Sequence, residues 1–160
     1  MGKINILGLG PGDVDCLTLG VIKKLKSGIK NYLRTEKHPT VSFLKENNIP
    51  YKSYDYVYEK EDEFDNVYEY IVEDLINNSK EYNEINYLVP GSPMVAERTV
   101  EMLLERDMED VNIELVGGMS FIEPILQLVK RDPINGLKIV DGTRFSIRDI
   151  DINIDKLQIY

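Results

Sequence analysis

The sequence predicts an α/β fold, with a five-stranded, mainly parallel sheet flanked by helices and the start of a truncated second α/β domain. Short apolar, β-branched runs alternate along the chain with segments of helical periodicity, which is typical of parallel strands joined by helical crossovers. No internal repeat or linker interrupts this alternation. The chain has 160 residues, of which 42% are hydrophobic and 29% charged, as in an ordinary globular protein. We expect an N-terminal α/β domain over residues 1–116. Residues 117–160 are expected to form a connecting helix and the beginning of the second domain.

The first part of the chain predicts three strands and two helices. Residues 3–9 are apolar and end in glycines, like a buried parallel strand. Helical spacing of apolar residues over 18–26 predicts the first helix. A second strand is expected over 29–34, followed by a helix after Pro39. Residues 51–58 alternate in character, so we expect a third strand with three tyrosines on one face: Tyr54, Tyr56 and Tyr58.

The middle of the chain continues the alternation. A long helix is expected from about Asp62 to Asn78. Its apolar stripe consists of Phe64, Val67, Tyr68, Ile71, Leu75 and Ile76. A fourth strand is expected over 85–89 and a helix from Val95 to about Glu105. The fifth strand is expected over 111–116, followed by a helix over 121–130.

The last part of the chain differs from the rest. Asp132-Pro133 and Gly136 interrupt the helical pattern, and two short apolar runs over 137–142 and 156–160 predict strands with no helix between them. The apolar pattern continues to Tyr160. We therefore expect that the second domain is truncated soon after it begins.

Charge and cysteine content exclude several classes of protein. Nineteen Lys and Arg against 28 Asp and Glu give a net charge of −9, which disfavours nucleic acids and anionic membrane surfaces as partners. A single cysteine, Cys16, excludes a disulfide framework and a multi-cysteine zinc site, and we expect no metal site. The N-terminus has no signal-peptide pattern, so we expect a cytoplasmic protein.

Glycine- and proline-rich loops follow three of the predicted strands. The first is Gly8–Asp13, the second Pro90–Pro93, and the third Gly117–Ser120. In open parallel sheets, ligands bind outside the carboxyl ends of the strands, where small residues let a ligand approach the backbone. The three loops therefore predict a ligand-binding crevice. The alternative is that they are only tight turns, with Ser120 capping the following helix together with Glu123.

The first loop does not match a phosphate-binding fingerprint. Asp13 stands where the dinucleotide motif needs its third glycine, and Pro11 lacks the N–H that a phosphate cradle uses. Neither of the first two loops is followed by Gly-Lys-Ser/Thr. An acidic crevice of this kind suits a neutral or cationic small molecule better than a nucleotide.

Four segments in this order resemble the tetrapyrrole (corrin/porphyrin) methylase family: GLGPGDVDCLT, LRTEKHPTV, LVPGSPMVAERTV and VGGMSFIEP. The chain is most similar to the YabN-like branch, in which this domain precedes a MazG-type nucleoside triphosphate pyrophosphohydrolase. The resemblance implies methyl transfer from S-adenosylmethionine to a small molecule, in this family a tetrapyrrole. It also implies a cleft between two α/β domains and a homodimer.

The resemblance also implies which residues bind the cofactor. Pro90, Gly91 and Ser92 would meet its methionine portion, and the other contacts would come from Pro11, Gly12, Ser120 and Phe121. In better-defined methylases, Gly-Gly-Asp-Pro stands where this chain has Pro90–Pro93, so a carboxylate is missing here.

For the substrate, we expect contacts from Gly10, Asp13, Arg34 and His38. Arg34 would pair with a substrate carboxylate, or cap a neighbouring strand end. For His38, the only histidine, an exposed position before a helix-starting proline is the favoured interpretation. We assign no catalytic base.

Two other functions compete with methyl transfer. In the first, the chain is a non-catalytic module that senses a small ligand for an attached pyrophosphohydrolase. The missing carboxylate at Ser92 slightly favours this alternative. Alternatively, Asp65, Glu69 and Glu73, which align on one helix face, would hold Mg²⁺ for nucleotide hydrolysis. A solvated helix face is the favoured interpretation of that row.

Overall fold

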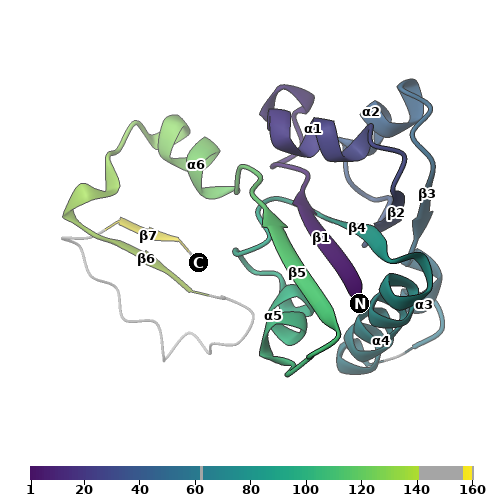
Figure 1. The fold of residues 1–160 in the computed structure, drawn as a ribbon. Coiled ribbons are helices and arrows are strands. Elements are labelled where there is room, and N and C mark those ends of the chain that lie inside the picture. The colour runs from purple at the N-terminus through teal and green to yellow at the C-terminus, as the bar shows by residue number, and fades with distance from the viewer. Residues whose placement is uncertain (62, 141–156, 160) are drawn as a thin grey trace. The chain divides into compact units, whose positions relative to one another are not determined.

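The computed structural model describes residues 1–61, 63–140 and 157–159, which fall into two compact units, Met1–Phe121 and Ile122–Tyr160 (Figure 1). The division between the units lies after Phe121, somewhat later than the expected boundary at residue 116. All residues of the three glycine-rich loops belong to the first unit. Among the described residues, no helix is both long and apolar enough to cross a bilayer.

The first unit is built on a sheet of five strands in the order β3-β2-β4-β1-β5. The strands are β1 (Gly2–Gly8), β2 (Lys30–Leu33), β3 (Tyr51–Ser53), β4 (Glu84–Val89) and β5 (Val111–Val116). Every neighbouring pair is parallel, and β1 lies between β4 and β5. The predicted five-stranded parallel sheet is therefore confirmed.

Helices cover both faces of this sheet (Figure 1). They are α1 (Leu19–Leu25), α2 (Val41–Glu46), α3 (Asp55–Tyr58), α4 (Phe64–Tyr82) and α5 (Arg98–Glu105), with a short 3₁₀ turn at Val14–Cys16. On one face, Val21 of α1 and Leu44 of α2 pack with Leu7 and Leu88 of the strands. On the other face, the core is formed by α3, α4 and α5 over side chains such as Tyr87. Each face excludes water from one side of the strands, which is why their apolar runs are nearly continuous.

The third strand is shorter than predicted, because it ends at Ser53 and residues 55–58 form α3. The Asp55 carboxylate accepts hydrogen bonds from the Ser53 and Thr35 hydroxyls and from the Glu36 N–H, each at 2.6 Å. These bonds tie the end of β3 to the segment after β2 and turn the chain into a helix. The prediction that Tyr54, Tyr56 and Tyr58 share one strand face is therefore wrong.

The predicted stripe of the long helix is correct except at its first position. Val67, Ile71 and Leu75 are fully or almost fully buried, whereas the Phe64 side chain is 67% exposed. The Phe64 ring instead stacks on Tyr68, with ring centroids 6.1 Å apart. At the first turn of α4, the aromatic side chain contacts its own helix rather than the core.

Three asparagines form a buried row across the sheet, which the sequence analysis did not predict. Asn5 of β1 faces Asn86 of β4, and Asn86 faces Asn31 of β2. The Asn5 amide donates to Asn86 Oδ1 at 3.0 Å, and the Asn86 amide donates to Asn31 Oδ1 at 2.9 Å. Lys24 of α1 donates to Asn5 Oδ1 at 3.0 Å. The three buried amides thus satisfy one another, as buried polar groups must.

The second unit contains α6 (Ile122–Val129), a 3₁₀ turn (Pro133–Asn135), β6 (Leu137–Ile139) and β7 (Leu157–Ile159). The Asp132 carboxylate caps the 3₁₀ turn by accepting a bond from the Ile134 N–H at 2.9 Å. β6 and β7 pair in parallel. The helix and the two expected strand regions are therefore present, while residues 141–156, and with them the expected absence of a helix there, lie outside the described residues.

Candidate functional site

The first two glycine-rich loops are bonded to each other at the carboxyl ends of β1 and β4. The Gly10 N–H donates to Gly91 O at 3.1 Å, and the Gly91 N–H donates to Gly10 O at 2.8 Å. The two loops are neighbours because β1 and β4 are adjacent strands, as a crevice formed by both loops requires.

The third loop lies against the other two with direct backbone contact. A Cβ atom at Gly118 would lie 2.4 Å from Gly8 O and 2.6 Å from Gly91 O. A Cβ at Gly8 would lie 2.5 Å from Gly91 O and 2.8 Å from Gly118 Cα. Side-chain carbons do not approach other atoms this closely, so Gly8 and Gly118 must be glycine for the loops to meet. We call residues Gly8–Asp13, Pro90–Pro93 and Gly117–Phe121 the loop junction.

The loop junction offers space and hydrogen-bond donors to a ligand. Gly91 has a φ of +63°, and a Cβ built on it would meet no atom within 4 Å. The Gly10 and Gly91 N–H groups are used by each other. The N–H groups of Gly12 and Ser92, by contrast, have no partner within the described residues. A small ligand that carries hydrogen-bond acceptors fits these groups.

The remaining predicted residues of the junction differ in accessibility. Ser120 is buried, at 3% exposure, and Phe121 is 37% exposed. Pro11 and Pro90 are half-buried. Asp13 is exposed, and its carboxylate caps the Val14–Cys16 turn by accepting a bond from the Asp15 N–H at 2.9 Å. Asp13 therefore has a local structural role at the edge of the junction, and its contact with a substrate stays a prediction.

His38 lies against the first loop and is half-buried, which corrects the favoured interpretation of an exposed histidine. A Cβ at Gly12 would lie 3.4 Å from Cγ of the adjacent Pro39, and the Thr40 hydroxyl donates to Leu9 O at 3.1 Å. Burial lowers the pKa of His38, and the Gly10 backbone partly opposes this effect. The imidazole is therefore a neutral group beside the junction at neutral pH.

Arg34, predicted to meet a substrate carboxylate, is paired with a carboxylate of this chain. Its Nη1 atom lies 2.5 Å from Glu97 Oε2, and its Nε donates to the Tyr58 hydroxyl at 3.1 Å. The side chains of Arg34 and Glu97 are only 17% and 4% exposed. The pair joins the end of β2 to the start of α5 and thereby anchors the segment after the second loop.

Glu97, which the sequence did not single out, lies inside the predicted helix, whereas the observed α5 begins one residue later, at Arg98. The preceding residue, Ala96, has a φ of +57°, a conformation that non-glycine residues rarely adopt and that costs about 1 kcal/mol or more. Burial raises the pKa of Glu97 to about 7, against the attraction of Arg34. For Arg34, burial alone would lower the pKa, but the Glu97 charge and the Tyr58 hydroxyl raise it above its usual value.

We expect Glu97→Gln to flatten part of the pH dependence of stability. The folded-state pKa of Glu97 is above the ordinary value of 4.5, so the native carboxyl retains a proton that the unfolded chain releases. Its contribution to stability is present below pH 4.5 and is lost as the pH rises through about 7. Between pH 5 and 8, the parent chain should lose roughly 2 kcal/mol relative to Glu97→Gln, as measured by urea unfolding. Parallel pH profiles of the two chains would contradict this prediction.

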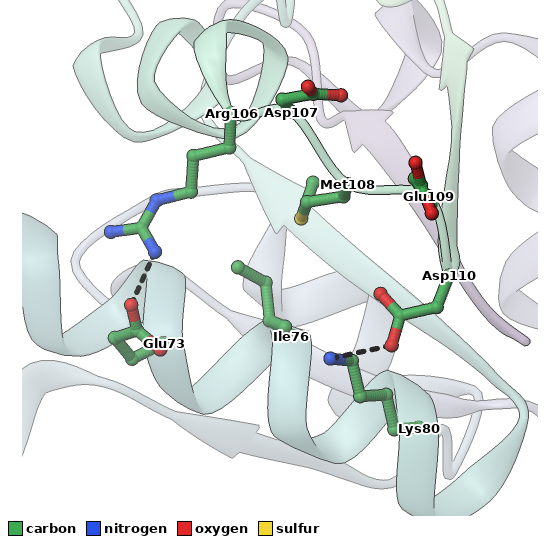
Figure 2. A pocket seen from close by; sticks show the side chains of 8 residues that line it. All are labelled: Glu73, Ile76, Lys80, Arg106, Asp107, Met108, Glu109 and Asp110. Atoms are coloured by element: carbon green, nitrogen blue, oxygen red, sulfur yellow. Dashed lines mark hydrogen bonds and ion pairs between the residues drawn. The ribbon is translucent and has the colours of Figure 1, made fainter.

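The row of carboxylates on α4 faces an arginine. Glu69 and Glu73 both accept hydrogen bonds from Arg106, at the end of α5. A pocket of about 450 Å³ lies beside them, between α4 and residues 106–110 (Figure 2). Figure 2 shows Arg106 bonded to Glu73 and Lys80 paired with Asp110 across this pocket.

The pocket beside Glu73 and Arg106 is distinct from the loop junction. Residues 106–110 precede β5, whereas the third loop of the junction follows β5, so the two lie at opposite ends of that strand. In residues 1–61, 63–140 and 157–159, no group of three or more metal-ligating side chains occurs. Two carboxylates of the row, those of Glu69 and Glu73, form ion pairs with Arg106.

The comparisons with known proteins agree with the resemblance found in the sequence. The model of the family described as Tetrapyrrole (Corrin/Porphyrin) Methylases matches residues 3–143. A curated relative, the uncharacterized protein YabN of Bacillus subtilis (strain 168), is 38% identical over 152 residues. The alignment covers 94% of this chain and 31% of that protein, so the chain spans about a third of the relative's length.

Solved structures share the fold. A uroporphyrin-III C-methyltransferase of Thermus thermophilus is 20% identical and aligns with a TM-score of 0.65, covering 91% of this chain and 64% of that one. A second structure of that enzyme, in complex with S-adenosylhomocysteine, is 21% identical with a TM-score of 0.58, covering 86% of this chain and 54% of that one. At these identities the likeness is one of fold.

Proposed function

Because the chain belongs to the tetrapyrrole (corrin/porphyrin) methylase family, we propose that it transfers a methyl group from S-adenosylmethionine, its family's cofactor, and binds that cofactor at the loop junction. The observation that carries this proposal is the direct backbone contact of three glycine-rich loops at the carboxyl ends of β1, β4 and β5, with space left open at Gly91. The position agrees with the general location of ligand sites in open α/β sheets.

In this proposal, the backbone does most of the binding. The free N–H groups of Gly12 and Ser92 would bind the carboxylate of the methionine portion, with Pro11, Pro90 and Gly91 beside it. Ser120 and Phe121 would complete the site. The net charge of −9 suits a sulfonium cation, which supplies the electrophilic methyl carbon when the cofactor is bound.

Methyl transfer asks little else of these residues. The reaction is a displacement at a methyl carbon, whose rate depends mainly on holding the nucleophile and the methyl group in line. Rigid loops with backbone donors meet that requirement. The acceptor is a small molecule in this proposal, and a tetrapyrrole is the expectation that comes with the family.

We expect Gly91→Ala to weaken binding of S-adenosylhomocysteine at least tenfold, because the added methyl group enters the space that the cofactor needs. Gly28→Ala is the matched control. Gly28 also has a positive φ, +80°, and a Cβ there also meets no atom within 4 Å, but it precedes β2 at the other end of the sheet. Both variants should lose about 1–2 kcal/mol of stability from backbone strain. Calorimetric titration of S-adenosylmethionine and S-adenosylhomocysteine into the parent chain and both variants tests the difference.

Two results would contradict the proposal. One is that neither S-adenosylmethionine nor S-adenosylhomocysteine binds to the folded parent chain. The other is equal binding by Gly91→Ala and Gly28→Ala, because it would place the ligand away from the junction.

A second function is favoured by one observation. Ser92 stands where the family's better-defined methylases carry an aspartate, and this is consistent with a ligand-sensing module attached to a pyrophosphohydrolase. Binding of the cofactor to the full-length protein without any methyl transfer, together with a change in pyrophosphohydrolase activity, would favour this alternative. Homodimer formation also stays a prediction, which sedimentation can test.

A further inference from the structure

The second loop is bonded to other parts of the first unit near both of its ends. It leads from β4 to α5 through residues 90–97. Near its start, the Gly91 N–H donates to Gly10 O at 2.8 Å. At its end, the Glu97 carboxylate accepts a hydrogen bond from Arg34 Nη1 at 2.5 Å. The loop is therefore fixed at two points.

Arg34 holds the chain on both sides of this loop. Its backbone N–H donates to Leu88 O of β4 at 3.0 Å, just before the loop, and its side chain donates to Glu97, the last residue of the loop. The guanidinium Nε also bonds to the Tyr58 hydroxyl at 3.1 Å, and the guanidinium carbon lies 5.6 Å from the centre of the Tyr68 ring. One arginine thus closes a ring that consists of the end of β4, the second loop and the Arg34–Glu97 pair.

The residue before Glu97 has a backbone conformation that needs support from its surroundings. Ala96 has a φ of +57° and is exposed. Non-glycine residues persist in this conformation only where the neighbouring structure imposes it, and such residues are concentrated at ligand sites. Because the Ala96 side chain is in water, its own packing does not supply that support. The buried Glu97 carboxylate and its bond to Arg34 supply it.

The hydrogen bonds inside the loop are local. The Val95 N–H donates to Ser92 O at 3.1 Å, and the Met94 N–H donates to Ser92 Oγ at 3.4 Å. Such bonds move with the loop. Besides the burial of Pro93, the position of Ser92 therefore depends on the two fixed ends. The Ser92 N–H is one of the two donors proposed to bind the cofactor.

We propose that Arg34 and Glu97 are positioning residues of the cofactor site: their ion pair fixes the far end of the second loop, so that the Ser92 N–H keeps the position from which it binds the cofactor. Neither side chain touches the cofactor in this inference. The inference rests on the proposed function, because the donor at Ser92 is assigned to the cofactor there. It also gives Arg34 a role other than the predicted contact with a substrate carboxylate, since Glu97 uses the guanidinium.

The charge of Glu97 makes this pair sensitive to pH. Burial raises the pKa of Glu97 to about 7, against the attraction of Arg34, so the ion pair forms mainly above that pH. The other titratable groups that face the pair are the hydroxyls of Tyr58, Tyr68 and Tyr87. Tyrosine hydroxyls titrate near pH 10, and burial raises the pKa of Tyr58 and Tyr87 further. Between pH 6 and 8, Glu97 is therefore the group of this cluster that changes its charge.

Glu97→Gln replaces the titrating carboxylate with a neutral side chain of similar shape. At pH 6 the parent and this variant should bind S-adenosylhomocysteine within about twofold of each other. At pH 8 the parent should bind about threefold to tenfold more tightly, because only the parent then forms the ion pair. Calorimetric titration measures the affinities. The ratio between the chains removes the titration of the ligand and of His38, which both chains share.

A second measurement follows the loop without any ligand. In ¹H–¹⁵N spectra of the ligand-free parent, the amide signals of Gly91 and Ser92 should shift with pH around a midpoint of about 7, as the ion pair forms. In Glu97→Gln this transition should be absent. A purely stabilising role of the pair would leave these two amides unchanged in the folded chain.

Arg98→Met is the matched control. Arg98 directly follows Glu97, but it pairs with Glu101 where both side chains are largely in water. Its loss should change neither the affinity for S-adenosylhomocysteine nor the pH profile of the loop amides. Urea unfolding at pH 6 and pH 8 confirms that each chain is folded in the titrations.

The outcomes distinguish this inference from the proposed function. If S-adenosylhomocysteine binds and Gly91→Ala weakens binding, the proposed function stands. The inference is then wrong if the affinity ratio of the parent and Glu97→Gln is the same at both pH values, or if the loop amides do not follow the titration of Glu97. It is also wrong if Arg98→Met behaves like Glu97→Gln. Absence of binding to the folded parent overturns both.

Discussion

Gly118→Ala is expected to destabilise the chain by about 3 kcal/mol or more, the largest effect of any single methyl group in the first unit. The new Cβ would lie 2.4 Å from Gly8 O and 2.6 Å from both Gly8 C and Gly91 O. These are backbone atoms, which cannot rotate away as the end of a long side chain can. The three loops must separate to admit the methyl group, and overpacking against rigid neighbours costs about 1–3 kcal/mol, occasionally more. Urea unfolding followed by circular dichroism measures the loss.

Gly117→Ala is the control for this prediction. A Cβ at Gly117 meets no atom within 4 Å, although the residue is the direct neighbour of Gly118 in the same loop. Its stability should equal that of the parent or exceed it slightly, because alanine restricts the unfolded chain more than glycine does. Equal stabilities of Gly117→Ala and Gly118→Ala would show that the loops do not meet as described.

The second large effect is expected from Arg34→Met, which should cost about 3–5 kcal/mol at pH 9, where Glu97, whose pKa in the folded parent is about 7, is ionised and paired with Arg34. The substitution removes the guanidinium from a Glu97 carboxylate that is 4% exposed, and an unpaired buried charge is far more costly than the pair is favourable. Part of the loss should be recovered in the double variant Arg34→Met, Glu97→Gln, in which no buried charge remains. Denaturant unfolding of the four chains gives the coupling energy directly.

Arg98→Met controls for the loss of an arginine as such. Arg98 pairs with Glu101 on the exposed side of α5, at 2.6 Å, with both side chains largely in water. Exposed ion pairs contribute little, so this variant should unfold nearly like the parent. If Arg34→Met and Arg98→Met behave alike, or if the double variant is no more stable than Arg34→Met, the Arg34–Glu97 pair is not the anchor described here.

The predicted elements were correct where apolar periodicity and the core agree. The strands at 3–9, 85–89 and 111–116 and the long helix lie in continuous hydrophobic clusters, so local pattern and tertiary packing favour the same structure. Residues 54–58 were mispredicted because the alternation of tyrosines competes with the bonds that Asp55 makes to the segment after β2. Those bonds join residues about 20 positions apart, and no local window contains them.

The predictable part of the candidate site consists of positions where the backbone conformation requires a particular residue type. Gly8, Gly10, Gly91 and Gly118 are required by close approach or positive φ, and their loops follow strands that the pattern identifies. Glu97 was missed because its significance depends on Arg34, which is 63 residues away. The burial of His38 was missed for the same reason, since the groups beside it include the backbone of Gly10, which is 28 positions away in the sequence.

The row of asparagines across β1, β4 and β2 has a consequence for how the chain reaches its native state. The amides of Asn5 and Asn86 are 81 residues apart in sequence, and those of Asn86 and Asn31 are 55 apart. Their hydrogen bonds form only when all three strands are paired in the right order and alignment. A strand shifted by one residue would set a buried amide against isoleucine or tyrosine, so the row raises the energy of misaligned sheets more than it lowers that of the native one. Because such distant segments must meet first, the completed sheet is expected to appear late in folding, as a slow and highly selective step.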